Sequence, residues 1–195
     1  VLEKLKLKNP KLFVSSFNRA NIHYLVAPKH DSYERLVKYL NQHRGESGII
    51  YALSRQSTEA LAERLCSDGF KAKPYHAGLD KNKRDKHQEL FQKDEIDLIV
   101  ATIAFGMGIN KSNVRFVIHM DLPKNIEGYY QETGRAGRDG IKSEALLFYS
   151  SGDVLKLKRF AEVEGNPEQT RIMSRKLRQM ADFCEIRTCR RRHLL

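Results

Sequence analysis

Short apolar runs alternate along the chain with segments whose apolar residues recur at helical spacing. Runs of this kind, bounded by turn residues, are typical of strands buried on both faces of a sheet. Such strands are expected at 22–27, 48–53, 71–75, 98–101, 114–120 and 144–149, after a first extended segment at 12–17. Helices are expected at 32–43, 56–67, 82–92, from Asn125 onward, at 153–164 and from Pro167 onward. The alternation predicts an α/β fold in which right-handed crossovers build a parallel sheet flanked by helices.

Residues at the helix ends fit these boundaries. Asp31, followed three residues later by Glu34, has the spacing of a capping box at the start of helix 32–43. Gly69 is placed to end helix 56–67, and Gly165 to end helix 153–164. Pro167 suits the first turn of the last helix, which lies beyond the predicted sheet and is expected to begin a different module.

The composition points to a polyanionic partner. The chain has 195 residues, enough for one buried core with a short appendage. It carries 35 Lys and Arg against 24 Asp and Glu, for a net charge of +11 and a pI of about 9.6. A basic protein gains affinity for nucleic acid because each neutralised phosphate releases a condensed counterion. The alternative is a solvated basic surface without a partner.

Three further features bear on the cellular setting. Three cysteines without a C-x-x-C spacing argue against a disulfide scaffold and favour a reducing compartment. No stretch approaches the roughly 20 apolar residues that span a bilayer, and no leader-like segment is present. The chain starts with Val1 and ends after a run of cations, which indicates a piece of a longer protein. A soluble intracellular protein with no membrane partner is expected.

Two predicted strands, 98–101 and 114–120, run into loops of polar residues and glycines. Ligands of open α/β sheets bind beyond the carboxyl ends of the strands, so both loops are predicted to reach a ligand. The second loop ends in Gly134-Arg135-Ala136-Gly137-Arg138-Asp139-Gly140, where two arginines stand among three glycines. This composition suits a loop that approaches an anion.

The two arginines of this loop have a possible catalytic role. In phosphoryl transfer, an arginine delivered from a separate lobe neutralises charge on the transferring phosphate, an effect of roughly 10³ to 10⁵ in rate. Arg135 and Arg138 are the candidates for this role. The alternative is that both arginines pair at the surface with Glu132 and Asp139.

The residues just before this loop are expected to form a short helix. Tyr129, Tyr130 and Thr133 share one face, and tyrosines at this spacing more often belong to a core than to a base-stacking surface. Gln131 shares a face with Arg135 and is the better candidate for a polar contact.

The chain lacks the usual means of holding a nucleotide by itself. Its sequence has no G-x-x-x-x-G-K-[S/T] loop to cradle phosphates and no paired acids after a strand to hold magnesium. The arginine loop would therefore complement a nucleotide held by another lobe.

Together these motifs resemble those of RecQ-family DNA helicases. A-T-x-A-F-G-M-G-I-N-K at 101–111 and Y-Y-Q-E-T-G-R-A-G-R-D-G at 129–140 are similar to motifs V and VI of that family, with F-x-x-H-x-D-x-P at 116–123 between them. The segments at 48–55, 75–79 and 16–21 resemble motif IV, the loop before the next helix and the linker from the first lobe. DEAD-box RNA helicases end motif VI differently, with H-R-x-G-R-x-G-R, which favours the DNA-directed family. The resemblance extends from about residue 13 to residue 195.

The resemblance implies roles for particular residues. Arg138 would be the arginine finger, with Arg135 and Gln131 beside it in a composite ATP site. Motif V, with Gly106, Met107, Gly108 and Asn110, would couple nucleotide state to the nucleic acid. Residues along the single-strand path would be Ser54, Arg55, His76 and Thr102. His76 has an alternative role as a cap of the following helix.

The resemblance also implies cofactors and domain limits. ATP and Mg²⁺ would be bound mainly by an N-terminal RecA-like lobe outside this chain. Cys189 matches the first zinc ligand of the region that follows the helicase lobes, with its three partner cysteines beyond Leu195. Cys184 matches no ligand. The expected units are a linker and first strand at 1–28, a RecA-like lobe at 29–165 and the start of a zinc-binding region at 166–195.

The function implied is that of a motor lobe in an ATP-dependent helicase, which moves three-prime to five-prime on single-stranded and forked DNA in replication, recombination and repair. Its compartment would be the bacterial cytoplasm or the nucleus. Two alternatives remain: a lobe of a superfamily-two RNA helicase, and a non-enzymatic nucleic-acid-binding adaptor.

Overall fold

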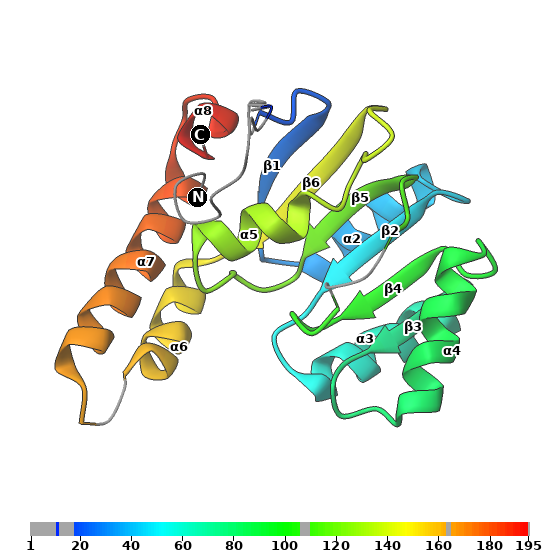
Figure 1. Ribbon diagram of the computed structural model, residues 1–195, viewed down its shortest axis with the longest axis horizontal. Coiled ribbons are helices and arrows are strands. Elements are labelled where there is room, and N and C mark those ends of the chain that lie inside the picture. The colour runs from blue at the N-terminus through cyan, green and yellow to red at the C-terminus, as the bar shows by residue number, and fades with distance from the viewer. Residues whose placement is uncertain (1–10, 12–17, 106–109, 163–164, 195) are drawn as a thin grey trace.

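A parallel six-stranded sheet forms the centre of the molecule (Figure 1). The computed structural model describes residues 11, 18–105, 110–162 and 165–194. The strands are β1 (Ile22–Pro28), β2 (Ser47–Tyr51), β3 (Ala72–Tyr75), β4 (Leu98–Ala101), β5 (Val114–His119) and β6 (Ser143–Tyr149). The helices are α2 (Ser32–Gln42), α3 (Arg55–Ser67), α4 (Lys81–Gln92), α5 (Ile126–Thr133), α6 (Ser151–Ala161), α7 (Pro167–Glu185) and α8 (Arg190–Leu194).

The strand order is β1-β6-β5-β2-β4-β3, and every neighbouring pair is parallel. The predicted α/β fold with a parallel sheet is therefore confirmed. Each strand predicted within the described residues is present, and β1 lies at one edge beside β6, the last strand in sequence. The extended segment predicted at 12–17 lies outside the described residues.

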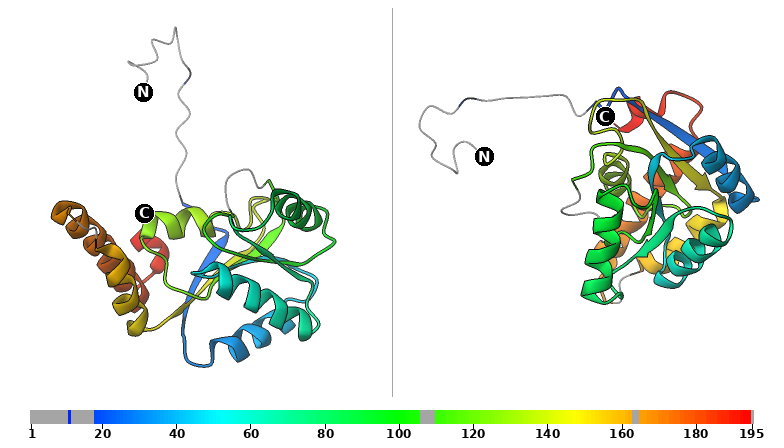
Figure 2. Two further views of the ribbon diagram at one scale, coloured as in Figure 1. Left: turned by 90° about the horizontal axis from the view of Figure 1, so that it is seen from below. Right: turned by 90° about the vertical axis from the view of Figure 1, so that its right-hand side faces the viewer.

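Two helical layers cover the sheet, and alternate strand residues face each layer. Ile50 and Ile118 belong to a core cluster with Leu36 of α2 and Leu65 of α3. Ile49 belongs to the opposite cluster, together with residues of α4, α5 and α7. Figure 2, on the left, shows α2 and α3 on one side of the sheet and α4 and α5 on the other. Burial on both faces explains why the strands read as continuous apolar runs.

Gly48 is required where β2 lies beside β5 in the sheet. It pairs with Phe116, which is completely buried, and a Cβ on Gly48 would overlap the Phe116 ring. The aromatic ring therefore fills the space that a side chain would take.

Two details of the helix ends differ from the predictions. Asp31 precedes α2 but adopts a left-handed conformation (φ 50°, ψ 38°), and its side chain makes no capping hydrogen bond. Its Oδ2 instead lies 2.7 Å from Nδ1 of His30, so the predicted capping box is wrong. Helix α6 ends at Ala161, because Glu162 is extended, and so it does not continue to Gly165 as predicted. Gly69 does end α3 with a positive φ of 83°, as predicted.

Helix α7 packs against the same core as the sheet. Leu177, Met180 and Phe183 belong to the cluster that contains Tyr129 of α5, and the Phe183 and Tyr129 ring centroids are 5.3 Å apart. The boundary between units at 165 and 166 stays a prediction. Among the described residues, no helix has the length and apolar character needed to cross a membrane.

Candidate functional site

The arginine loop lies on one face of the sheet and not beyond the carboxyl ends of the strands. Only the first part of the segment after β5 is at the carboxyl edge of the sheet. Helix α5 then returns the chain toward the first residues of β5. The amide of Gly137 donates to the carbonyl of Val114, the first residue of β5, at 2.8 Å. The prediction that this loop extends past a carboxyl strand end is therefore wrong, because it overlooked the return direction of the helix.

Helix α5 begins as predicted at Asn125, whose side-chain oxygen accepts a hydrogen bond from the amide of Gly128 at 2.7 Å. Tyr129 is completely buried, and its ring centroid lies 5.1 Å from that of His119 and 6.2 Å from that of Tyr24. Its predicted place in the core is confirmed. Gln131 is exposed on the same helix.

The backbone of the arginine loop is held by residues that precede β1. Arg19 donates hydrogen bonds to the carbonyl oxygens of Gly134, Ala136 and Gly137 at 3.1, 2.8 and 2.9 Å. Asn21 Nδ2 donates to the carbonyl of Gly137 at 2.8 Å. These donors occupy the carbonyls of the turn, so the loop has a defined shape although it contains several glycines.

The first loop arginine reaches a buried tyrosine. Arg135 Nε donates to the Tyr51 hydroxyl at 3.0 Å, and that hydroxyl donates to the Phe105 carbonyl at 3.0 Å. Burial raises the pKa of Tyr51, whereas the positive charges of Arg135 and Arg138 act to lower it. Both loop arginines are thus close enough to the Tyr51 hydroxyl to influence it electrostatically, although Arg138 itself is exposed.

The two carboxylates that could have paired with the loop arginines have other partners. Glu132 Oε2 lies 2.7 Å from His119 Nε2, with side chains only 13% and 2% exposed. Asp139 pairs with Arg115. Glu132 and Asp139 thus each have a partner besides the loop arginines, and the alternative of surface pairing stays open.

A second group of predicted residues lies at the carboxyl edge, where β2 and β4 end side by side. Ser54 caps α3: its hydroxyl accepts from the Ser57 amide at 3.0 Å, and the Ser57 hydroxyl accepts from the Ser54 amide at 3.1 Å. Arg55 opens that helix and is exposed. Thr102 follows β4, and its hydroxyl accepts from the Ala104 amide at 3.4 Å. The structure therefore brings Ser54, Arg55 and Thr102 to one edge of the sheet.

His76 behaves differently from this group. Its side chain is 4% exposed, and its Nε2 lies 2.9 Å from Glu59 Oε1. The following helix is capped by Asp80 rather than by His76. A phosphate contact by His76 stays a prediction, and it would require the side chain to leave this buried position.

A cavity of about 320 Å³ lies beside these loops, between the ends of β2 and β5. The sequence prediction missed several residues around it, among them Tyr51, His119 and Asp121. Asp121 accepts hydrogen bonds from Lys29 Nζ at 2.7 Å and from the Leu53 amide at 2.9 Å. The F-x-x-H-x-D-x-P pattern contained His119 and Asp121, so their regular spacing at the end of a strand was an available signal.

Part of motif V lies outside the described residues, namely Gly106, Met107 and Gly108. Asn110 is exposed. Lys111 follows it and is buried, with Nζ 2.6 Å from Asp94 Oδ1. Asp94 also accepts from the Ser47 hydroxyl at 3.1 Å. These contacts fix the end of motif V beside the start of β2.

The cysteines near the chain end have contrasting surroundings. Cys184 is 4% exposed, and burial raises the pKa of its thiol to about 12. Cys189 is exposed, and hydrogen bonds from the backbone of Arg192 and Arg191 lower the pKa of its thiol. Only Cys189 thus has the accessible, easily ionised sulfur that a zinc ligand needs. Within the described residues, no group of three or more acidic, histidine or cysteine side chains is arranged to hold a metal.

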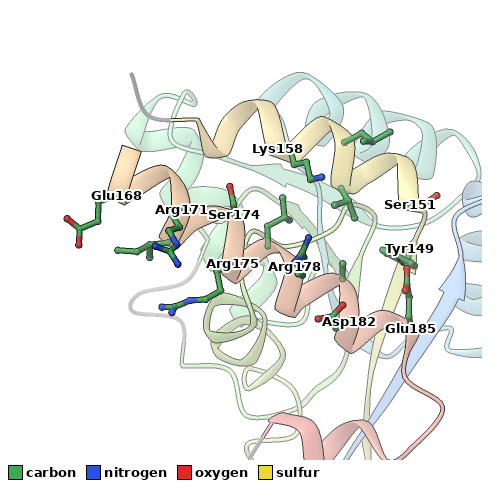
Figure 3. A pocket seen from close by; sticks show the side chains of 15 residues that line it. Tyr149, Ser151, Lys158, Glu168, Arg171, Ser174, Arg175, Arg178, Asp182 and Glu185 are labelled. Atoms are coloured by element: carbon green, nitrogen blue, oxygen red, sulfur yellow. Dashed lines mark hydrogen bonds between the residues drawn. The ribbon is translucent and has the colours of Figure 1, made fainter. Parts of the chain in front are cut away.

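A second cavity, larger than the first, lies elsewhere on the molecule. It has a volume of about 1140 Å³ and lies between α6 and α7, with Lys158, Arg171, Arg175 and Arg178 among its lining side chains (Figure 3). None of the predicted site residues lines it.

Comparison with known proteins agrees with this arrangement. Residues 31–140 match the family described as helicase conserved C-terminal domain, and residues 151–195 match the RecQ zinc-binding family. The second match begins at α6, before the predicted boundary. In a solved structure of a DEAD box protein from Methanococcus jannaschii, the match covers 82% of this chain and 41% of that chain, with a TM-score of 0.62 and 28% identity.

Relatives with assigned names extend the likeness over the whole chain. The chain is 47% identical over 195 residues to the ATP-dependent DNA helicase RecQ of Pasteurella multocida, and 47% identical over 199 residues to the ATP-dependent DNA helicase hus2/rqh1 of Schizosaccharomyces pombe. It spans 31% and 15% of the lengths of these two proteins. The fold, the two family matches and this identity show that the chain belongs to the helicase C-terminal domain family, as the C-terminal lobe of a RecQ-family helicase with an adjoining zinc-binding region.

Proposed function

We propose that this chain is the second motor lobe of an ATP-dependent DNA helicase. The observation that carries the proposal is the arginine loop, which the rest of the lobe holds in a defined shape while leaving Arg138 exposed. An arginine that must reach a phosphate on another lobe needs both properties. Arg138 is the finger in this proposal, with Arg135 and Gln131 beside it.

ATP and Mg²⁺ are held mainly by an N-terminal RecA-like lobe, because this chain has no phosphate-cradling loop. When that lobe closes on this one, the arginine charge stabilises the transferring phosphate. In the proposal, motif V, with Gly106, Met107, Gly108 and Asn110, couples nucleotide state to the nucleic acid.

The nucleic acid crosses the carboxyl edge of the sheet. Hydroxyls and amides at Ser54 and Thr102, with the cation of Arg55, suit contacts to phosphates that position a strand without reading its sequence. His76 joins this path only if its side chain leaves Glu59. The net charge of +11 favours the same partner. Single-stranded and forked DNA, with three-prime to five-prime movement, are the proposed substrates, in the bacterial cytoplasm or the nucleus.

The zinc-binding region contributes Cys189 as a zinc ligand in this proposal. An exposed sulfur with a lowered pKa fits the thiolate that Zn²⁺ requires. The remaining ligands would come from beyond Leu195.

The test is the ATPase rate of a protein that contains both lobes, measured with single-stranded DNA, with RNA and without nucleic acid. We expect DNA to stimulate the rate well above RNA, and Arg138→Ala to lower kcat at least roughly a hundredfold with DNA affinity nearly intact. Arg35→Ala is the matched control, since Arg35 is exposed on α2 and its side chain donates to the His30 carbonyl, away from the arginine loop. Stimulation mainly by RNA would instead support the RNA helicase lobe, and absence of any ATPase would support the adaptor. An Arg138→Ala protein as active as the control would exclude the finger role.

A further inference from the structure

The Tyr51 hydroxyl connects two loops that the proposed function separates. It accepts a hydrogen bond from Arg135 Nε at 3.0 Å and donates one to the Phe105 carbonyl at 3.0 Å. Arg135 belongs to the loop of the proposed ATP site, whereas Phe105 belongs to the part of motif V that follows β4. A single buried oxygen is therefore bonded to both loops.

The tyrosine ring has little freedom to move. Tyr51 is 3% exposed, and its ring stacks on His119 with centroids 5.0 Å apart and an interplanar angle of 22°. His119 is held in turn by Glu132 at 2.7 Å, and Glu132 stands three residues before Arg135. The stack fixes the position of the hydroxyl relative to the end of α5.

The Phe105 carbonyl, which accepts the hydrogen bond from Tyr51, belongs to a compact turn. The Phe105 amide donates to the Thr102 carbonyl at 3.0 Å, and the Thr102 amide donates to the carbonyl of Tyr75 at 3.2 Å. Ile103, within the turn, is 73% exposed. A strand bound at Thr102 would press on this exposed turn, and a shift of the turn would move the Phe105 carbonyl that Tyr51 contacts.

We infer that Tyr51 is a positioning residue that transmits nucleic-acid binding at the 102–105 turn to Arg135 through its hydroxyl. This inference rests on the proposed function, to which it adds a path of contacts between the nucleic-acid site and the ATP site. The path has three contacts: Thr102 to Phe105 within the turn, Phe105 to Tyr51, and Tyr51 to Arg135. The bond from Tyr51 to Phe105 is buried and the bond from Arg135 to Tyr51 is partly buried, which limits their replacement by water.

Removing the hydroxyl alone tests the inference. Tyr51→Phe keeps the ring that stacks on His119 but breaks both hydrogen bonds. We expect the ratio of the ATPase kcat with saturating single-stranded DNA to the kcat without DNA to fall roughly tenfold, the size expected for one lost hydrogen bond to a charged group. The KM for ATP and the affinity for DNA should stay within about twofold. A ratio of rates is insensitive to the fraction of folded enzyme, so a merely structural role would not change it.

Tyr39→Phe is the matched control. The Tyr39 hydroxyl donates to Glu144 Oε2 at 2.8 Å, and its ring packs with the core on the opposite face of the sheet. This variant also loses a hydrogen bond to a charged group, but we expect its stimulation ratio to equal that of the unchanged protein. Equal ratios for Tyr51→Phe and Tyr39→Phe would overturn the inference.

A double-mutant cycle supplies a second, independent measurement. If Thr102 acts through Tyr51, the losses caused by Thr102→Ala and Tyr51→Phe should not multiply in the double variant. Fully multiplicative losses would also overturn the inference. Arg138→Ala distinguishes a failure of this inference from a failure of the proposed function. If Arg138→Ala is inactive and Tyr51→Phe is unaffected, the finger role of Arg138 stands and the role of Tyr51 is wrong.

Discussion

The guanidinium of Arg19 lies 2.8 Å from the carbonyl oxygen of Ala136, although 117 residues separate them in sequence. The same side chain donates to the carbonyls of Gly134 and Gly137. A planar fork with several fixed donors can serve three carbonyls of one turn, which a flexible ammonium group cannot. Arg19 is thus the main side-chain support of the loop that carries Arg135 and Arg138.

Arg19→Lys should therefore lower kcat of the two-lobe ATPase by about tenfold to a hundredfold, because small displacements of a catalytic group have effects of that size. The DNA affinity should change by less than about twofold. Arg191→Lys is the control, since Arg191 also donates to two carbonyls, those of Ala20 and Ile22, without touching the arginine loop. Equal losses in the two variants would mean that Arg19 acts only on general stability.

Gly137 allows a second test of the loop, on stability rather than activity. Its φ is +57°, and a Cβ there would overlap Asn21 Nδ2 and lie 2.6 Å from the Ser143 hydroxyl. Gly69 also has a positive φ, +83°, but a Cβ there would meet nothing within 4 Å. Both Gly→Ala variants incur the left-handed backbone penalty of about 1 kcal/mol, and only Gly137→Ala adds a steric clash.

We expect the free energy of unfolding, measured in urea, to fall by about 1 kcal/mol for Gly69→Ala and by about 3 kcal/mol or more for Gly137→Ala. The difference between the two variants isolates the packing of the loop against Asn21 and Ser143. Closely similar losses would show that the loop relaxes around the new methyl group and is less constrained than the hydrogen bonds to Arg19 indicate.

The sequence was sufficient to predict the layout of the sheet. Strands buried on both faces, such as β2 and β5, carry mostly apolar residues, and the helices between them have regular apolar spacing. These local patterns, with the strong preference for right-handed crossovers, predict a parallel sheet without knowledge of any distant contact, but not the order of its strands. The motif spacing also gave the arginines and the strand-end residues as candidates, and their roles stay predictions.

The contacts between distant residues could not be predicted in this way. Tyr51 lies within an apolar run and reads as a core residue, and nothing local to it indicates that its hydroxyl meets Arg135. Arg19 stands in a segment that reads as a linker. The left-handed backbone of Asp31 is likewise not visible in the local sequence. Asp31 and Glu34 have the spacing of a capping box, but the box does not form. Each of these features depends on tertiary contacts rather than on local sequence.

The ion pair between Lys111 and Asp94 should make stability depend on pH in the acid range. The hydrogen bond from Lys111 lowers the pKa of Asp94, with further help from Ser47. A lowered carboxyl pKa in the folded state contributes stability that is present above the unfolded value of about 4 and lost as the pH falls through the folded value. The contribution is therefore complete at pH 7 and disappears at more acidic pH.

Lys111→Met tests this dependence, since methionine can keep the contact with the Phe91 ring that the Lys111 side chain makes. At pH 7 the variant should unfold at a lower urea concentration than the unchanged protein, and the gap should narrow as the pH approaches about 3. Lys93→Met removes an exposed pair with Glu89 and should have little effect at either pH. A gap for Lys111→Met that stays constant with pH would show that packing, and not the ion pair, accounts for the loss.

The two cysteines near the chain end should react at very different rates with a thiol reagent. Cys184 is buried within α7 and its pKa is raised to about 12, whereas Cys189 is exposed and its pKa is lowered by backbone hydrogen bonds. Because the thiolate is the reactive form, iodoacetamide at pH 7.5 should modify Cys184 at least about a hundredfold more slowly than Cys189. Cys66 is exposed and serves as the internal reference, and peptide mass spectrometry measures all three rates in one sample.

The same measurement tests the proposed zinc ligand in a protein that continues beyond Leu195. Adding Zn²⁺ should slow modification of Cys189 without changing the rate at Cys66, because a metal-bound thiolate is a poor nucleophile toward the reagent. A chelator should restore the rate at Cys189 and leave Cys184 unchanged while the core stays folded. If Zn²⁺ protected Cys184 instead, the ligand assignment would pass to the residue that the structure buries, and α7 would have to open to bind the metal.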